Sequence, residues 1–144
     1  MTDPSASPAT PPEGWAKHDR TSPLTAPWEP IWACRTERAL ALAVEVREPH
    51  CNSRGLAHGG LICALADNAM GLSAGVAARA DGLDAKAAVT VSLSVDFVDA
   101  ARPGDLLEVR PAVLRVGRSL AFVECHVVAG ERVIARGSAT FKMG

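Results

Sequence analysis

The sequence has 144 residues, of which 48% are hydrophobic and 22% charged, and its formal net charge is −1. This length and composition are typical of one ordinary globular domain with its own core. With a near-neutral charge and scattered arginines, the chain lacks the clustered basic face of a nucleic-acid-binding domain.

The first 22 residues are dense in Pro, Ser, Thr and Ala. This composition predicts a disordered tail over residues 1–22 and a folded domain over residues 23–144. Trp28 and Trp32 follow in "APWEPIW" and are expected to dock the incoming segment onto the domain. The polar, Pro-rich start does not resemble a secretory signal, so we expect a cytoplasmic protein.

The four cysteines show no C-x-x-C spacing, which favours reduced thiols over a disulfide framework. His50, Cys51 and His58 lie near one another, but no further thiol or acid follows at the spacing of zinc ligands. We therefore expect no metal site.

Residues 39–48, "ALALAVEVRE", end in an alternating apolar and polar pattern and predict a strand. The following "PHCNSRGLA" is rich in turn formers and predicts a loop. Residues 59 to about 80 are too long for one strand and rich in Ala and Leu, which predicts a helix. "ADG" at residues 80–82 is a plausible stop for that helix.

The C-terminal half predicts strands. Residues 88–98, "AVTVSLSVDFV", alternate so that valines, Leu93 and Phe97 would face the core while Thr90 and the serines face solvent. Residues 106–117 form a second predicted strand, with Pro111 at an edge or bulge. "SLAFVECHVV" and "ERVIARGSATFK" predict two more, joined by a tight turn at Ala129–Gly130. The expected order is a strand, the long helix and then a four-stranded antiparallel meander. The expected fold class is α+β, with a long central helix wrapped by a curved antiparallel sheet.

The predicted helix carries Asp67 and Asn68 near its midpoint. A membrane-spanning helix would hold these polar groups in hydrocarbon at a cost of several kcal/mol, and the following strands have a soluble pattern. The better interpretation is a core helix with one buried acid. Such an acid must be hydrogen-bonded, neutralised or used in chemistry, so Asp67 either fixes the helix in place or serves a reaction.

His58, Gly59 and Gly60 stand where the helix should begin. The first turn of a helix has unpaired N–H groups and a partial positive charge, and two glycines there let a ligand oxygen approach. The pattern is compatible with an oxyanion hole, but by itself it is a weak signal and also fits a junction whose glycines merely turn the chain.

Gly59 and Asp67 are eight residues apart, a rise of about 12 Å along a helix. Groups that act on one carbon must come within about 3 to 3.5 Å of it. If both residues act on one acyl group, they more naturally come from two chains, with the site at a homodimer interface.

The pattern "N-x-x-G-x-x-H-G-G-x-x-x-x-L-x-D-x-A", which starts at Asn52, resembles the hotdog-fold acyl-CoA thioesterases of the phenylacetic acid degradation family. "AVTVSLSVDFVDAARPGD" and "VLRVGRSLAFVECHV" resemble later segments of that family, and the similarity covers roughly residues 35–142. "EPIWACR" departs from the family where relatives often carry more glycine, and this segment is where the acyl pocket would be lined.

The resemblance implies a role for each matching residue. Asp67 would be the catalytic carboxylate, either as nucleophile or as general base on water. The Gly59 N–H would polarise the thioester carbonyl, while Asn52 and Thr90 would assist Asp67 or the water, and His58 would orient local groups. Gly60, Arg115, Arg118 and Ser119 fall where the family holds coenzyme A, and arginine suits its phosphates. Solvated loop charges are the other interpretation of these arginines.

Together these residues favour an acyl-CoA thioesterase without a cofactor, dimeric and assembled as a homotetramer, acting on an aryl-acyl or medium-chain acyl-CoA. Two alternatives remain. A hotdog enoyl-CoA hydratase or dehydratase would need a second well-placed His or acid, which the sequence does not offer near the helix. A non-catalytic acyl-CoA-binding module would bind the same ligands without hydrolysis.

Overall fold

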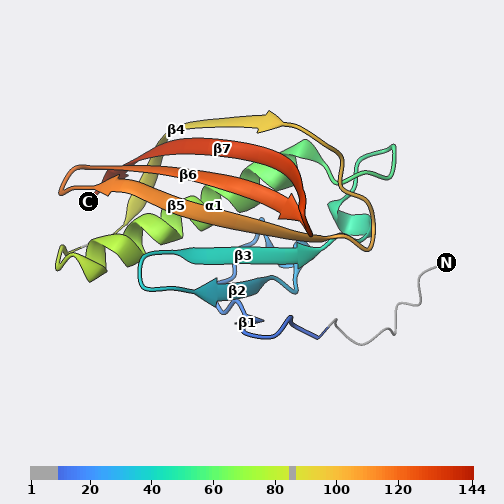
Figure 1. Ribbon diagram of the computed structural model, residues 1–144, viewed down its shortest axis with the longest axis horizontal. Helices are drawn as coiled ribbons and strands as arrows, with labels where there is room; N and C mark the ends of the chain where they lie inside the picture. The colour runs from blue at the N-terminus through green and yellow to red at the C-terminus, as the bar shows by residue number, and fades with distance from the viewer. Residues whose placement is uncertain (1–9, 85–86) are drawn as a thin grey trace.

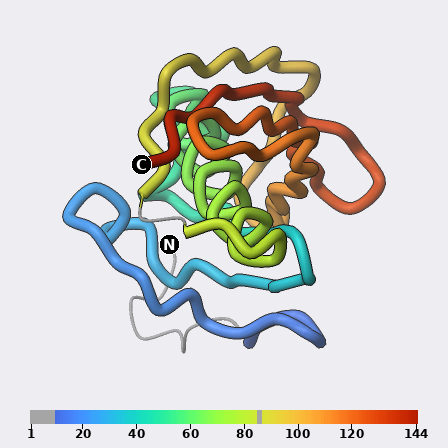
Figure 2. The backbone as a smooth tube through the Cα atoms, turned by 90° about the vertical axis from the view of Figure 1, so that its left-hand side faces the viewer, coloured from blue at the N-terminus to red at the C-terminus, as the bar shows by residue number. Residues whose placement is uncertain are grey.

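The computed structural model describes residues 10–84 and 87–144, which form one long helix and a seven-stranded antiparallel sheet (Figure 1). The elements in chain order are β1 (Ala16–Lys17), the 3-10 helix η1 (Ala26–Trp28), β2 (Trp32–Arg35), β3 (Leu40–Glu45), the 3-10 helix η2 (Glu48–His50), α1 (Gly59–Ala80), β4 (Ala88–Phe97), β5 (Leu106–Val116), β6 (Leu120–Ala129) and β7 (Arg132–Met143). The sheet curves around α1 (Figure 2), so the expected helix wrapped by a curved antiparallel sheet is confirmed.

The helix α1 begins and ends where the sequence predicts. His58 is its N-cap and Ala80 its last residue, and Gly82 takes the positive φ of 75° that ends the segment. By length and composition alone α1 could cross a membrane, but 61% of its most apolar window is buried inside the fold. It is the core helix of the domain.

The core forms where α1 meets the concave face of the sheet. Leu61, Leu65, Ala69 and Met70 recur at helical spacing and are buried against strand residues such as Phe141. Burying a side chain of the size of leucine contributes about 1.5 to 3 kcal/mol, so this contact dominates the stability of the domain.

The hydroxyl of Ser73 pins α1 to the start of β3. It accepts a hydrogen bond from the Leu40 N–H at 2.9 Å and donates one to the Leu40 carbonyl at 3.2 Å. Ser73 is fully buried, and both bonds satisfy a polar group that would otherwise destabilise the core. The helix is therefore held against β3 by a directional contact as well as by apolar packing.

The N-terminal part is more ordered than its composition predicts. Residues 1–9 lie outside the described residues, but within the predicted tail Ala16 and Lys17 pair with β2. β2 itself precedes the predicted first strand and pairs with β3. Trp32 is buried and Trp28 packs against the core, as expected. Backbone hydrogen bonds to a sheet edge provide this order, and a composition rich in Pro and Ser does not reveal them.

The strand order is β1-β2-β3-β5-β6-β7-β4, which corrects the expected four-stranded meander. β5, β6 and β7 do follow one another as hairpins, but β4 pairs with β7 at the far edge rather than with β5. The hairpin between β6 and β7 turns at Gly130, whose φ is 60°, and Glu131, one residue later than expected. Pro111 lies in β5 beyond the last residue that pairs with β3, in agreement with the predicted edge position.

The faces of β4 differ from strict alternation because the strand contains a bulge. Thr90 pairs with Phe141 and Ser92 with Thr140, which leaves Val91 as an extra residue. Thr90 therefore faces α1, whereas the serines after the bulge face outward. The expected half-buried apolar face is wrong for this chain by itself: Val89, Val91 and Phe97 are more than half exposed.

Candidate active site

Asp67 lies in the middle of α1, half-buried, and its carboxylate meets β4. The Thr90 hydroxyl donates a hydrogen bond to Asp67 Oδ1 at 2.6 Å. Among the residues that the structure describes, Oδ2 accepts no hydrogen bond from another side chain or N–H group. One oxygen of the carboxylate is thus held in place while the other remains open to a ligand.

A cavity of about 320 Å³ adjoins this carboxylate. One face of α1 forms its floor, with Asp67, Asn68, Gly71, Leu72, Gly75 and Arg79 following one another along the helix. Thr90, Phe141 and Met143 from β4 and β7 form another side. Ligand pockets are about 300 to 1,000 Å³, so the cavity is large enough for the acyl group of a ligand.

The remaining wall comes from residues 18–25, called the strap here. His18, Arg20, Thr21, Ser22 and Thr25 line the cavity from this segment. The strap is fixed by reciprocal hydrogen bonds between Ser22 and Thr25, whose hydroxyls lie 3.0 Å apart. The sequence placed most of this segment in a disordered tail, and no motif in it signals a pocket wall.

A second group of candidate residues lies at the start of α1. His58 Nδ1 accepts a hydrogen bond from the Gly60 N–H at 2.8 Å, which caps the helix. Gly60 therefore has no N–H to offer a ligand, while the Gly59 N–H precedes the first intrahelical bond. A methyl group added at Gly59 would lie 3.2 Å from the ring of Phe97, so the backbone of α1 lies close to this side chain of β4.

The two groups are not brought together within one chain. α1 is unbroken from Gly59 to Ala80, so Gly59 and Asp67 are separated by a rise of about 12 Å. Each group instead meets a different end of β4: Asp67 meets Thr90, and Gly59 meets Phe97. The helix and β4 therefore run antiparallel along this side of the molecule.

Asn52 lies in the loop before α1 and shapes that loop. Its side-chain oxygen accepts hydrogen bonds from the Arg54 N–H at 2.9 Å and the Leu56 N–H at 3.2 Å. This is the turn role that asparagine commonly fills. Only its side-chain NH₂ remains as a donor for another partner.

The residues expected to hold coenzyme A lie in three places: Gly60 at the start of α1, Arg118 and Ser119 between β5 and β6, and Arg115 on the sheet. Arg118 and Ser119 form the exposed turn between β5 and β6, and the Ser119 carbonyl accepts a hydrogen bond from the N–H of Met143, a cavity residue. The turn therefore lies at the rim of the cavity. Arg115 pairs with Phe122 on the outer face of the sheet, away from α1.

His50 fastens the segment after the strap to the loop that leads into α1. Its Nε2 donates to the Trp28 carbonyl at 2.9 Å and its Nδ1 accepts from the Arg47 N–H at 2.9 Å. Its own carbonyl accepts from the His58 N–H at 2.8 Å. Burial lowers the pKa of His50, although the Trp28 carbonyl opposes this. With both ring nitrogens engaged, His50 is not a metal ligand here.

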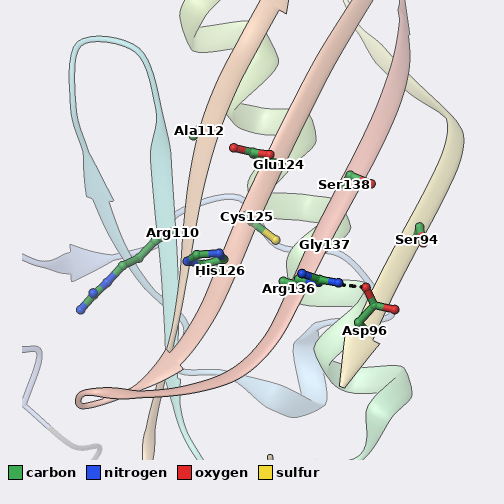
Figure 3. A pocket seen from close by; sticks show the side chains of 10 residues that line it. All are labelled: Ser94, Asp96, Arg110, Ala112, Glu124, Cys125, His126, Arg136, Gly137 and Ser138. Atoms are coloured by element: carbon green, nitrogen blue, oxygen red, sulfur yellow. Dashed lines mark hydrogen bonds and ion pairs between the residues drawn. The ribbon is translucent and has the colours of Figure 1, made fainter. Parts of the chain in front are cut away.

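A larger hollow of about 500 Å³ lies on the outer face of the sheet, across β5, β6, β7 and β4 (Figure 3). Charged side chains line it, and its two arginines are paired: Arg136 bonds Asp96 at 3.1 Å, and Arg110 bonds Glu108 at 2.9 Å. Cys125 lies beneath, and burial raises the pKa of its thiol to about 11. This hollow contains none of the residues that the sequence singled out.

Residues 54–135 match the thioesterase superfamily. A Pseudomonas aeruginosa protein named "Putative esterase PA0474" is 37% identical over 134 residues, which are 92% of this chain and 96% of that protein.

Solved structures share the fold. A variant of the phenylacetic acid degradation protein PaaI from Thermus thermophilus is 25% identical with a TM-score of 0.69, covering 84% of this chain and 98% of that one. The smu.793 protein from Streptococcus mutans, bound to acetyl CoA, is 22% identical with a TM-score of 0.73, covering 88% and 94%. The helix wrapped by a curved sheet is the hotdog fold, and the chain belongs to the thioesterase superfamily.

Proposed function

We propose that the protein hydrolyses an acyl-CoA thioester to the free acid and coenzyme A, with Asp67 as the reacting carboxylate. The observation that carries the proposal is the position of this carboxylate. It is held through one oxygen by Thr90, presents the other oxygen, and lines a cavity that has one apolar side. Membership of the thioesterase superfamily supports the same chemistry.

Two routes fit this arrangement. As a nucleophile, an Asp67 oxygen attacks the carbonyl carbon, the thiolate leaves, and water hydrolyses the mixed anhydride. As a general base, Asp67 takes a proton from water while the water oxygen attacks the same carbon. In both routes the thiolate gains a proton and the acid is released. Water is the only co-reactant, so the proposal includes no metal or cofactor.

The proposed oxyanion donor is the Gly59 N–H of the partner subunit. β4 is an edge strand, and among the described residues its outer edge has no strand partner. Antiparallel pairing of two such edges about a two-fold axis between Leu93 and Ser94 would set Thr90 opposite the partner's Phe97. Because Phe97 covers Gly59 and Thr90 holds Asp67, this pairing would bring each Asp67 towards the partner's Gly59.

Exposed apolar side chains support this dimer. Val91, Leu93 and Phe97 on β4 and the following Val98 are 36% to 61% exposed. A long, apolar, unpaired edge is a liability in a monomer and a template for pairing with a second copy. The proposed assembly is a homodimer that forms the site, with two dimers building a homotetramer.

The proposed substrate is an aryl-acyl or medium-chain acyl-CoA, as in phenylacetic acid degradation. Support comes from the PaaI-like fold, the acetyl CoA bound by the Streptococcus mutans protein, and the apolar cavity wall. Arg118 and Ser119 at the cavity rim would contact the nucleotide part of coenzyme A, with Asn52 positioning water and His58 capping the helix.

The test is thiol release from a panel of short, medium, dicarboxylic and aryl acyl-CoAs by the wild type and Asp67→Asn. We expect hydrolysis by the wild type and a loss of at least about a hundredfold in the variant, the size of a lost catalytic group. Binding of acyl-CoA without thiol release by the wild type would instead identify a binding module. Hydration of enoyl-CoA would identify a hydratase.

A further inference from the structure

The cavity beside Asp67 contains two arginines that the proposed chemistry does not use. Arg79 comes from the last turn of α1 and Arg20 from the strap. Within residues 10–84 and 87–144, neither guanidinium makes an ion pair. Both are exposed, so they are solvated cations that a ligand could reach.

Arg79 points back into the cavity rather than towards the end of the helix. Its Nη1 lies 3.4 Å from the position that a Cβ on Gly75 would occupy, so the guanidinium rests over Gly75. The neighbouring acid, Asp81, accepts hydrogen bonds from Arg38 at 2.6 Å and 3.2 Å, and these bonds lower the pKa of Asp81. The Arg79 cation is therefore left facing the cavity.

The cavity between Asp67 and Arg79 has an apolar side. Leu72, Ala88, Phe141 and Met143 line it, and Gly71 keeps the helix surface low where the ring of Phe141 packs. A hydrocarbon chain suits such a surface, and a cationic group at its end favours an anionic oxygen. Together they describe a chain with a thioester at one end and a negative charge at the other.

We propose that Arg79, assisted by Arg20, binds the terminal carboxylate of a dicarboxylic acyl group. This inference rests on the proposed function and narrows its substrate class. The rise from Asp67 to Gly75 is about 12 Å. An extended chain advances about 1.2 Å per bond, so roughly ten bonds separate the two ends of the acyl group. A dicarboxylic chain of about ten carbons has this length, from the thioester carbonyl carbon to a terminal carboxylate oxygen.

Phosphate groups of coenzyme A carry similar anionic oxygens, so the test separates the two sources. We would compare sebacyl and decanoyl thioesters, which have ten carbons and differ in the terminal carboxylate. Each is offered on coenzyme A and on N-acetylcysteamine, which has no phosphate. The proteins are the wild type, Arg79→Gln, Arg79→Lys, Arg20→Gln, and Arg136→Gln as a control on the outer face of the sheet.

We expect the wild type to prefer the sebacyl ester on both carriers. Arg79→Gln should lower the ratio of sebacyl to decanoyl kcat/KM by about ten- to hundredfold, the range for a lost charged hydrogen bond. Arg79→Lys should keep part of the preference for the sebacyl ester. Arg20→Gln should lower the ratio less than Arg79→Gln does, and Arg136→Gln should leave the ratio unchanged.

Arg79→Gln could instead lower kcat/KM equally for sebacyl- and decanoyl-CoA and leave kcat/KM unchanged for the N-acetylcysteamine esters. That result would overturn the carboxylate site in favour of phosphate binding. An unchanged ratio in Arg79→Gln would overturn it outright while leaving the thioesterase proposal intact. If the wild type hydrolyses none of the esters, the proposed function fails. Equilibrium binding of sebacyl- and decanoyl-CoA to the wild type and Arg79→Gln would then still decide the carboxylate site.

Discussion

The two hollows of this domain differ in how their charges are used. The outer hollow is the larger, about 500 Å³, but its arginines are paired with acids on the same sheet. The cavity beside α1 is smaller, about 320 Å³, yet among the described residues it holds a carboxylate with one open oxygen and two arginines without ion pairs. Groups that already satisfy one another have little left for a ligand, so the state of the charges is a better guide to a site than volume.

The largest contrast is expected between the acids of the two hollows. In the thiol-release assay, Asp67→Asn should lose at least about a hundredfold in kcat, whereas Glu124→Gln in the outer hollow should keep the wild-type rate. Unchanged melting temperatures would show that both variants fold. A large loss in Glu124→Gln would move the site to the outer face and break the comparison.

A second contrast concerns the apolar side chains exposed on β4 and on the outer face. Leu93→Asp should convert the dimer into monomers and lower kcat by about a hundredfold or more, because the oxyanion donor of the partner is lost. Leu114→Asp, on β5, should keep the dimer that forms the site and should keep its activity. Sedimentation equilibrium with parallel rate measurements tests both. A Leu93→Asp monomer with full activity would contradict the shared site.

Thr90 and Ser94 give a smaller, matched contrast on the same strand. Removing the Thr90 hydroxyl frees Asp67 Oδ1 and should cost about tenfold in kcat, equivalent to one hydrogen bond to a charged group. Thr90→Ser should recover most of the rate. Ser94→Ala, which lines the outer hollow, should have no effect, and equal losses at both positions would argue for a general disturbance of β4.

The smallest expected effect is on stability and involves His50. Its pKa is lowered by burial, so the folded state stays neutral where the unfolded chain, with a pKa of about 6.5, takes up a proton. The unfolded state then binds more protons, and the free energy of unfolding falls as the pH drops below about 6.5. We would measure the free energy of unfolding by urea denaturation at about pH 7.5 and about pH 5.5, on either side of that value. The decrease between the two should be smaller in His50→Gln than in the wild type. His126→Gln, in the outer hollow, should keep the wild-type loss.

The sequence predicts the helix well and the surroundings of Asp67 less well. A run of Ala and Leu that ends at "ADG" suffices to place α1, because helix propensity and a glycine stop are local signals. Thr90 was named from the resemblance, although the alternation of its strand placed it on the solvent face. The bulge that turns it inward depends on pairing with β7, which is a long-range property.

The strap, too, could not be predicted from local sequence. Its composition is that of a tail, and its order comes from contacts outside its own residues, such as the Ile31 carbonyl that accepts a hydrogen bond from the His18 N–H. Arg20 and Arg79 could not be joined from the sequence, because they are 59 positions apart and no motif links them.

The extra residue at Val91 also changes which face of the sheet the residues before and after it occupy. Positions 90 and 97 are an odd number apart, and in a regular strand they would face opposite sides. With the bulge, Thr90 contacts Asp67 and Phe97 covers Gly59 from the same side. One strand can therefore serve both the acid and the oxyanion end of the helix. Inserting or deleting a single residue between Thr90 and Phe97 would turn one of these side chains to the other face of the sheet and break its contact with α1. The length of this segment is therefore constrained even where its side chains are not.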